Sequence, residues 1–195
     1  TAMKGCNNVC SFCVVPYTRG REVSRTYAEV VAECAELAEV GVREVTLVGQ
    51  NVNSYTGGCD FASLLRRVAA IPQIARIRFT TSHPHDLSDA LIAVFADEPK
   101  VMPHFHLPVQ SGSDTVLKRM RRDYTVKSYL ARLAQLRAAR RGIAVTTDIL
   151  AAFPGEEEKG ADATPRPLED ARLRNAFTLP LSPRPPPLAK SRCGG

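Results

Sequence analysis

Residues 42–49 read VREVTLVG, a short run rich in β-forming residues that ends at a glycine. Residues 60–71 follow it with apolar side chains at helical spacing, and Pro72 closes this helix. Parallel strands need a connection of about this length, so the stretch predicts a strand and its crossover helix. Further patterns occupy residues 27–40 (helix), 74–80 (strand), 87–96 (helix), 104–107 (strand), 114–120 (helix), 126–141 (helix) and 143–150 (strand).

Repeated alternation of strands and helices predicts an α/β fold built on a parallel sheet. Parallel strands bring their carboxyl ends to one edge, and the loops at that edge carry the functional residues of barrel folds. Polar residues that directly follow the expected strands are therefore the candidates for a binding site.

The composition changes in the last part of the chain. Seven of the 14 prolines lie in residues 161–195, and only residues 175–179 there resemble a strand. A proline inside a helix costs about 3 kcal/mol or more, so no regular helix is expected in this part. We interpret residues 1–160 as the folded core and residues 161–195 as a degraded last unit with a proline-rich, poorly ordered tail.

Length and charge restrict the classes of protein that need to be considered. With 195 residues, 44% of them hydrophobic, the chain has enough apolar surface for one sizeable core. The formal net charge of +6 favours an anionic partner such as RNA without identifying one. No apolar run is long enough to cross a bilayer and no secretory signal is present, so we expect a soluble, intracellular monomer. Because the chain starts at Thr1, close to a cysteine cluster, we interpret it as a fragment.

Half of the six cysteines, Cys6, Cys10 and Cys13, crowd into a CxxxCxxC motif, and the others are scattered along the chain. Three thiolates are enough to hold three irons of a cubane cluster and to leave the fourth iron open for a ligand. A structural zinc site is the alternative, with Cys34, Cys59 or a histidine as its fourth ligand. The spacing by itself leaves both interpretations open.

Several motifs surround and follow the cysteines. They are residues 4–25 (KGCNNVCSFCVVPYTRGREVSR), 47–55 (LVGQNVNSY), 78–84 (RFTTSHP), 106–114 (HLPVQSGSD) and 153–156 (FPGE), with weaker ones at 176–178 (AFT) and 182–185 (SPRP). In sequence and in order they resemble the motifs of the MiaB-like tRNA methylthiotransferases, a family of the radical-SAM superfamily. The resemblance covers nearly the whole chain.

This resemblance implies a partial (β/α) barrel of the radical-SAM type that binds a 4Fe–4S cluster and S-adenosylmethionine (SAM). It implies that Cys6, Cys10 and Cys13 hold the cluster and that reductive cleavage of SAM yields a radical. The family installs a methylthio group on C2 of isopentenyladenosine beside the tRNA anticodon. The implied partners are the tRNA anticodon stem-loop and a reductant such as flavodoxin or ferredoxin. The implied compartment is the cytoplasm, with an organelle matrix as the alternative.

Two other functions stay open at the level of the sequence. One is a truncated, catalytically silent module that binds an iron-sulfur cluster without carrying out the reaction. The other is a sister methylthiotransferase that acts on another modified adenosine or on a ribosomal protein. The run GQNVN at residues 49–53 favours the isopentenyladenosine branch.

The candidate cofactor-binding residues lie at or just beyond the ends of the expected strands, together with one aromatic residue of the cysteine loop. They are Phe12, Gln50, Asn51, Ser82, Gln110, Ser111 and Asp148. Gln50 and Asn51 are candidates for the methionine moiety, Ser82 and Gln110 for the ribose or adenine, and Phe12 for packing near the adenine. A helix cap or a loop hydrogen bond is the alternative role for any single polar residue at a strand end.

Basic residues supply the candidates for RNA contact. Arg19, Arg21 and Arg25 follow the cysteines closely and are suited to bind substrate phosphates, with salt bridges inside the loop as the alternative. Residues 118–124 form a second basic patch that includes Tyr124, although a solvated helix end explains this patch equally well.

The sequence also departs from the family pattern. Ala152 stands where the family has a glycine, and we expect a cost there if the backbone needs a positive φ. Gly160, Pro165 and Pro167 interrupt the helix that the family pattern places next. The family's second cysteine trio and its RNA-binding domain have no counterpart in this sequence.

Overall fold

The computed structural model describes residues 1–154 and 173–181. Its strands and main helices are β1 Met3–Lys4, α1 Val15–Arg19, β2 Val23–Ser24, α2 Tyr27–Glu39, β3 Glu44–Val48, α3 Phe61–Ala69, β4 Arg76–Thr80, α4 Asp89–Asp97, β5 His104–His106, α5 Asp114–Arg119, α6 Val126–Ala139, β6 Ala144–Ala151 and β7 Asn175–Pro180. Short 3₁₀ turns, Val52–Ser54 and Pro84–Asp86, follow β3 and β4. The order of strands and helices expected from the sequence is confirmed.

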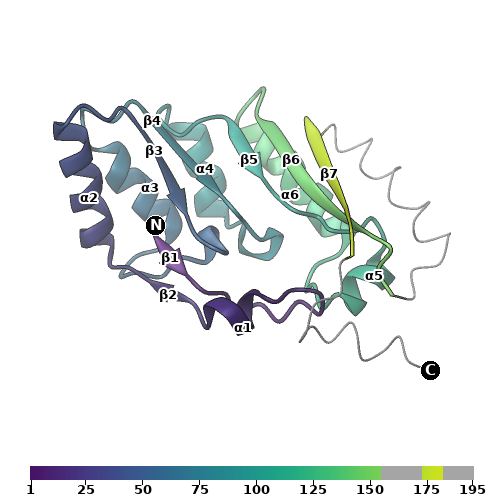
Figure 1. The fold of residues 1–195 in the computed structure, drawn as a ribbon. Helices are drawn as coiled ribbons and strands as arrows, with labels where there is room; N and C mark the ends of the chain where they lie inside the picture. Colours follow the sequence, from purple (N-terminus) through teal and green to yellow (C-terminus); the bar gives the residue numbers. More distant parts are fainter. Residues whose placement is uncertain (155–172, 182–195) are drawn as a thin grey trace.

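Two parallel sheets carry the fold. β3 pairs with β4, with Val48 opposite Thr80, and β5, β6 and β7 form the second sheet in that order. A single bridge between Ile77 of β4 and Val101 before β5 links the two sheets. Figure 1 shows the strands following one another from β3 to β7 across the molecule, with α3, α4 and α6 behind them. Parallel pairing within each sheet brings the carboxyl ends of its strands to one edge.

The sheets do not close on themselves. Among the described residues β3 and β7 are the outer strands of their sheets, and neither pairs with the other. The expected α/β fold is therefore confirmed as a partial barrel. In residues 1–154 and 173–181, no helix combines the length and the apolar character that a membrane span requires.

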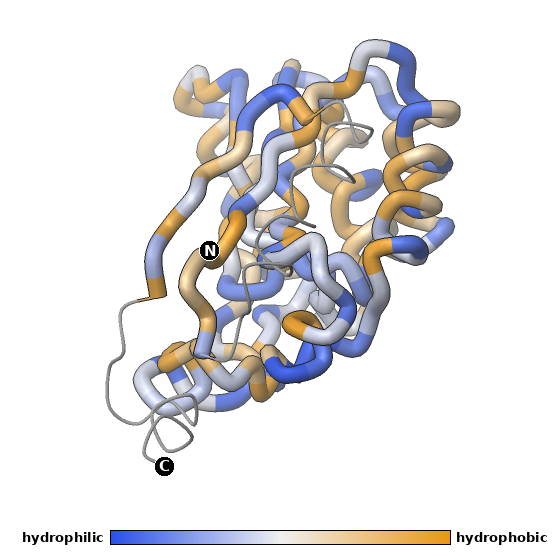
Figure 2. Tube along the Cα trace, turned by 90° about the vertical axis from the view of Figure 1, so that its right-hand side faces the viewer, coloured by the Kyte–Doolittle hydropathy of each residue, from blue (hydrophilic) through white to orange (hydrophobic). Residues whose placement is uncertain are grey.

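One main core lies between the sheets and the helices. The ring of Phe79 on β4 lies 5.0 Å from that of Phe61 on α3, 5.9 Å from that of Phe95 on α4 and 5.4 Å from that of Phe105 on β5. These four buried rings join neighbouring strands to their covering helices. Figure 2 shows hydrophobic and hydrophilic residues alternating along the helices, as expected of helices with one buried face.

Local hydrogen bonds shift some of the expected boundaries. The Ser88 side chain accepts from the Leu91 N–H, so α4 begins at Asp89 rather than at Leu87. The Ile74 N–H donates to the Ile71 carbonyl in a turn, and β4 accordingly begins two residues later than Ile74.

The strand expected at residues 175–179 is confirmed as β7, which pairs in parallel with β6 along its full length. The expected core boundary at residue 160 and most of the proline-rich tail fall in residues 155–172 and 182–195, which lie outside the described residues.

A short antiparallel ribbon, not anticipated from the sequence, positions the cysteine loop. Met3 of β1 pairs with Ser24 of β2, so the two ends of the loop are held side by side. The Ala2 N–H donates to the Val48 carbonyl at the end of β3, at 2.9 Å. The loop is thereby tied to the carboxyl end of a sheet strand, below the strands in the view of Figure 1.

Candidate functional site

The cysteine loop is held by contacts between its two arms. The Cys6 N–H donates to the Gly20 carbonyl at 3.1 Å, and the Asn7 side chain and backbone exchange hydrogen bonds with Glu22. Between the arms, the Cys13 N–H donates to the Cys10 carbonyl in a tight turn. Helix α1, with Pro16 in its first turn, then reverses the chain.

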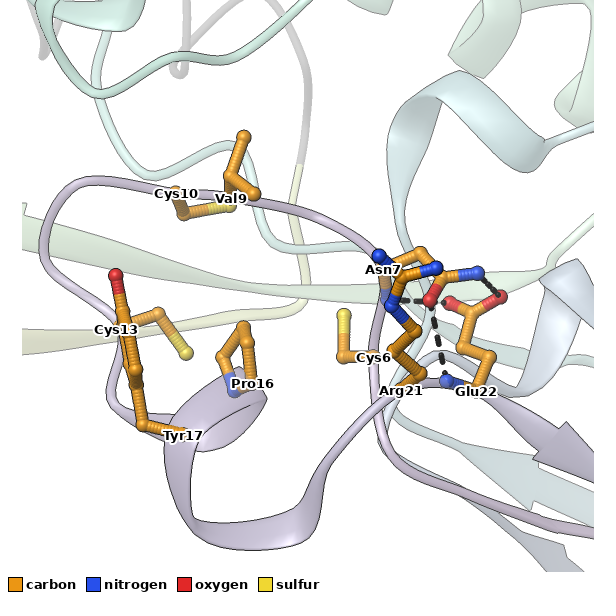
Figure 3. Close-up of a pocket in the computed structure, with 9 residues that line it drawn as sticks. All are labelled: Cys6, Asn7, Val9, Cys10, Cys13, Pro16, Tyr17, Arg21 and Glu22. Carbon is orange, nitrogen blue, oxygen red and sulfur yellow. Dashed lines mark hydrogen bonds between the residues drawn. The ribbon is translucent and has the colours of Figure 1, made fainter.

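The three cysteines of this loop line one cavity of about 660 Å³. The remaining lining residues are Asn7, Val9, Pro16, Tyr17, Arg21 and Glu22. Figure 3 shows Cys6, Cys10 and Cys13 around one opening, which Pro16 and Tyr17 of α1 bound on one side. Burial raises the pKa of Cys6 and of Cys10, so thiolate charge at these positions requires a nearby cation for compensation. A set of thiol donors around a cavity fits an iron-sulfur cluster.

The zinc alternative fits this geometry less well. A zinc ion needs its thiolates about 2.3 Å from a single centre. In the part of the chain that the structure describes, no three Cys, His, Asp or Glu side chains are close enough to hold one metal ion. Cys34 is buried on α2 and Cys59 packs against the main core, and neither lines the cavity. A group larger than a single ion therefore suits the three cysteines better.

The loop is also attached to the end of α5. The Ser11 N–H donates to the Met120 carbonyl at 3.1 Å, and the Ser11 hydroxyl donates to the Arg119 carbonyl at 3.0 Å. Phe12 packs next to Met120 in a second, smaller core with Val116. Phe12, which the sequence suggests for packing near a bound adenine, is part of this packed core and is not among the residues that line the cavity, and its contact with adenine stays a prediction.

Gln50 and Asn51 follow β3 and have different environments. The Gln50 Oε1 accepts from the Gly5 N–H at 2.6 Å, so this side chain holds the start of the cysteine loop. Asn51 is 2% exposed and its side chain donates to Asp86 at 2.7 Å, while its Oδ1 has no partner among residues 1–154 and 173–181. A buried polar atom without a partner indicates a site for a ligand or a water molecule.

The Gln50 contact leads to a stability prediction. We expect Gln50→Ala to lower the free energy of unfolding of the metal-free chain by about 1 kcal/mol, the typical net value of one hydrogen bond. Chemical denaturation measures this change, with the exposed Gln73→Ala as the matched control. If Gln50→Ala unfolds like the unaltered chain, the side chain does not support the loop.

The other candidates at the strand ends are also buried or partly buried. Ser82 is 6% exposed, and its hydroxyl has no partner among the described residues. The Gln110 backbone joins β6 by accepting from Leu150 and donating to Asp148, and the Ser111 hydroxyl accepts from the Ser113 N–H. The Asp148 carboxylate lies 3.3 Å from Nε2 of His106. The candidates thus follow β3, β4 and β5 or lie on β6.

Backbone strain is concentrated at these same strand ends. Thr81 after β4, Gln110 after β5 and Ala152 after β6 have φ values of 67°, 71° and 57°. Non-glycine residues rarely adopt this left-handed region, and residues held there cluster at functional sites. The positive φ that was the condition for a cost at Ala152 is therefore present. The cost itself stays a prediction.

A substitution at Ala152 measures this cost. Alanine in the left-handed region costs roughly 1–2 kcal/mol, and the greater freedom of glycine in the unfolded chain offsets roughly 0.5–1 kcal/mol of it. We expect Ala152→Gly to raise the free energy of unfolding by roughly 0.5–1 kcal/mol. Ala93→Gly, on the exposed face of α4, should have the opposite sign. Equal destabilisation by both variants in a denaturant titration would contradict the strain.

The three candidate arginines differ in their availability. Arg25 forms an ion pair with Glu33 and donates to the Thr1 carbonyl, so the salt-bridge alternative holds for this residue. Arg19 at the end of α1 is exposed, and Arg21 is exposed and lines the cavity. Arg19 and Arg21 are therefore the more available of the three for an anionic partner.

Sequence reasoning did not identify three buried polar residues near the loop. Ser11 attaches the loop to α5, as described above. The His83 carbonyl accepts from the Asn53 side-chain amide and the His83 N–H donates to the Asn53 Oδ1, and burial lowers the pKa of its imidazole to about 3. Arg122, which the sequence placed in a basic surface patch, is 9% exposed and lies over the rings of Phe12 and Tyr124. No local motif signals that these residues are buried.

The sequence model of the radical SAM superfamily matches residues 1–164, which include the cysteine loop and β1 to β6. The chain belongs to the radical SAM superfamily. Membership implies a 4Fe–4S cluster and SAM as cofactors, and the donor set of the cysteine loop fits the cluster.

Curated relatives of this radical SAM chain carry one name. A protein of Anaeromyxobacter sp. (strain Fw109-5) is 71% identical over 194 residues, which cover 100% of this chain and 42% of the relative. A protein of Myxococcus xanthus (strain DK1622) is 65% identical over 185 residues, which cover 95% of this chain and 40% of the relative. Both are named tRNA-2-methylthio-N(6)-dimethylallyladenosine synthase. The chain thus spans about two fifths of the length of these relatives.

Solved structures share the fold of the radical SAM chain at low sequence identity. The cobalamin-dependent SAM radical enzyme OxsB superposes with a TM-score of 0.71 at 12% identity, over 97% of this chain and 28% of that one. Streptococcus suis SuiB bound to SAM has a TM-score of 0.62 at 11% identity, over 95% of this chain and 40% of that one. These likenesses support the partial barrel.

Proposed function

We propose that this chain is the radical-SAM core of a tRNA methylthiotransferase that acts on C2 of isopentenyladenosine (dimethylallyladenosine) beside the anticodon. The names of relatives that are 71% and 65% identical support this substrate over another modified adenosine or a ribosomal protein. The motifs at residues 47–55, 78–84 and 106–114 lie at the carboxyl ends of β3, β4 and β5.

The observation that carries the proposal is the position of the cysteine cavity. Cys6, Cys10 and Cys13 line one cavity, and the loop that bears them is fixed to the end of β3 and to α5. In this proposal the three thiolates hold the cluster. When bound, the cluster and SAM supply one-electron chemistry, which an aromatic C–H bond without an acid-base handle requires.

The residues at the strand ends take different parts in the proposed site. The free Oδ1 of Asn51 and the free hydroxyl of Ser82 are the atoms best placed to bind polar groups of SAM, because both are buried without partners. Gln110, Ser111 and Asp148 continue the same rim along β5 and β6. Gln50 positions the cysteine loop through its hydrogen bond with Gly5, and Phe12 positions the loop by packing against the end of α5.

The proposed macromolecular partner is the tRNA anticodon stem-loop. Arg21 is exposed and lines the cavity, and Arg19 is exposed at the end of α1, so both can neutralise phosphates, whereas Arg25 is already paired with Glu33. We also propose a small reductant protein, flavodoxin or ferredoxin, as the electron source, a monomeric state and a cytoplasmic location. Residues 1–160 form the catalytic core in this proposal.

A SAM cleavage assay tests the catalytic part of the proposal. The chain is reconstituted anaerobically with iron and sulfide and incubated with SAM and dithionite, and deoxyadenosine is counted by chromatography. We expect slow formation of deoxyadenosine and methionine, and none from Cys10→Ala. A full cluster without any deoxyadenosine would favour a silent iron-sulfur module instead.

A chimera tests the substrate. The segment of the Myxococcus xanthus relative that matches this chain is replaced by this chain, and tRNA digests are analysed by mass spectrometry after incubation with SAM, reductant and sulfide. We expect 2-methylthio-dimethylallyladenosine from the chimera. Its absence, with full iron loading and with product from the unaltered relative, would contradict the proposed substrate.

A further inference from the structure

Arg122 is placed by the way α5 ends. The Arg121 N–H donates to the Lys118 carbonyl and the Arg122 N–H to the Leu117 carbonyl, and Arg121 has a φ of 57°. This is the Schellman pattern, in which one left-handed residue reverses the chain after a helix. Arg121 is left exposed, while Arg122 is turned into the protein.

The burial of Arg122 is unusual for a charged side chain. It is 9% exposed, and its Nε has no hydrogen-bond partner. Its guanidinium lies 5.7 Å from the ring centre of Phe12 and 5.8 Å from that of Tyr124. Within residues 1–154 and 173–181 it forms no ion pair with a carboxylate. A largely buried charge without a carboxylate partner is costly, and an anion bound beside it would offset this cost.

The surroundings of Arg122 point to the cysteine loop as the place of that anion. Phe12, which the guanidinium faces, stands between Cys10 and Cys13, and Ser11 binds the turn that precedes Arg122. His83 is neutral, because burial lowers its pKa to about 3, and burial raises the pKa of Tyr124.

We propose that Arg122 is a positioning residue whose guanidinium provides the counter-charge for a cluster held at Cys10. This inference rests on the proposed function. Three thiolates would outweigh the positive charge of a cubane core, so the loaded loop would carry a net negative charge, and a one-electron reduction would add to it. Attraction between opposite charges is stronger away from bulk water, so a fixed cation over the ring of Phe12 in the cysteine loop favours both cluster retention and the reduced state. Arginine keeps its charge when buried and stacks on aromatic rings, which suits it to this position.

The test compares variants with and without the cluster. Arg122→Met removes the charge and keeps an unbranched side chain, Arg122→Lys keeps the charge, and Arg121→Met removes an equal charge from the exposed neighbouring residue. Without the cluster, we expect Arg122→Met to melt at or above the temperature of the unaltered chain, because it removes a buried unpaired charge. With the cluster, we expect it to lose iron to a chelator at least tenfold faster.

Redox titration followed by electron paramagnetic resonance gives a second measure. We expect the midpoint potential of Arg122→Met to be lower than that of the unaltered chain. The expected shift is about 59 mV, which for one electron corresponds to a tenfold change in the ratio of oxidised to reduced cluster. The potential of Arg122→Lys should stay closer to that of the unaltered chain. Arg121→Met should have the same potential and the same rate of iron loss as the unaltered chain.

The possible outcomes separate the explanations. A purely structural role would destabilise Arg122→Met without the cluster as well, and this result, or an unfolded variant, would overturn the inference. An unchanged potential and rate of iron loss would also overturn it while leaving the proposed function intact. If the unaltered chain binds no cluster, the proposed function fails, and the inference fails with it.

Discussion

Alanine at Cys6, Cys10 or Cys13 should reduce the iron content of the anaerobically reconstituted chain from about four atoms per chain to background. The three thiols line the same cavity, and Cys34 and Cys59 do not line it and cannot replace a lost ligand there. Two remaining thiolates hold a cubane poorly, so each single substitution should have nearly the full effect. Iron and sulfide assays, with the visible absorption of the cluster, measure the loss.

Cys34→Ala is the matched control for these variants. Cys34 is buried on α2 within the main core, so its replacement should lower stability slightly and leave the iron content unchanged. Equal iron loss from Cys34→Ala, or full iron in any of the three loop variants, would contradict the assignment of the ligands.

Gly5→Ala should disrupt the loop almost as completely. A Cβ on Gly5 would lie 2.0 Å from the carbonyl oxygen of Arg21, and Gly5 has a φ of +77°. A clash with backbone cannot be relieved by rotating a side chain. Left-handed alanine costs a net roughly 0.5–1 kcal/mol relative to glycine and overpacking costs roughly 1–3 kcal/mol, so we expect a total loss of roughly 1.5–4 kcal/mol. Denaturant unfolding and iron content after reconstitution both report this effect.

Gly142→Ala separates the clash from the backbone conformation. Gly142 also has a φ of +77°, but an added Cβ there would have no atom within 4 Å. This control should cost only the conformational part, roughly 0.5–1 kcal/mol after the greater freedom of glycine in the unfolded chain is taken into account, and should keep its iron. If the two variants were equally stable and equally loaded, the close approach of Gly5 to Arg21 would not matter.

The fold could be predicted wherever the sequence has a local period. The run at residues 42–49 contains β3, and the helical pattern at residues 27–40 became α2, Tyr27–Glu39. The ribbon of β1 and β2 was missed because each strand has two residues, too few to show an alternation. Its pairing depends on contacts across the whole cysteine loop.

The cysteine ligands could be predicted because their spacing is a local property of the chain. The hydrogen-bond partner of Gln50 could not be predicted, because Gly5 lies 45 residues away in sequence. Arg122 resembled a surface residue because its neighbours are charged, and only the left-handed turn at Arg121 buries it. The strain at Thr81 and Gln110 likewise follows from the assembled sheet, because neither residue type favours a positive φ.

The central claim is that Cys6, Cys10 and Cys13 hold an iron-sulfur cluster in this chain. The most direct test is to reconstitute the purified chain without oxygen, determine iron, sulfide and zinc, and record the electron paramagnetic resonance spectrum after reduction. We expect a brown protein with about four irons and about four sulfides per chain and a signal from the reduced cluster. A colourless protein with one zinc per chain and no such signal would contradict it.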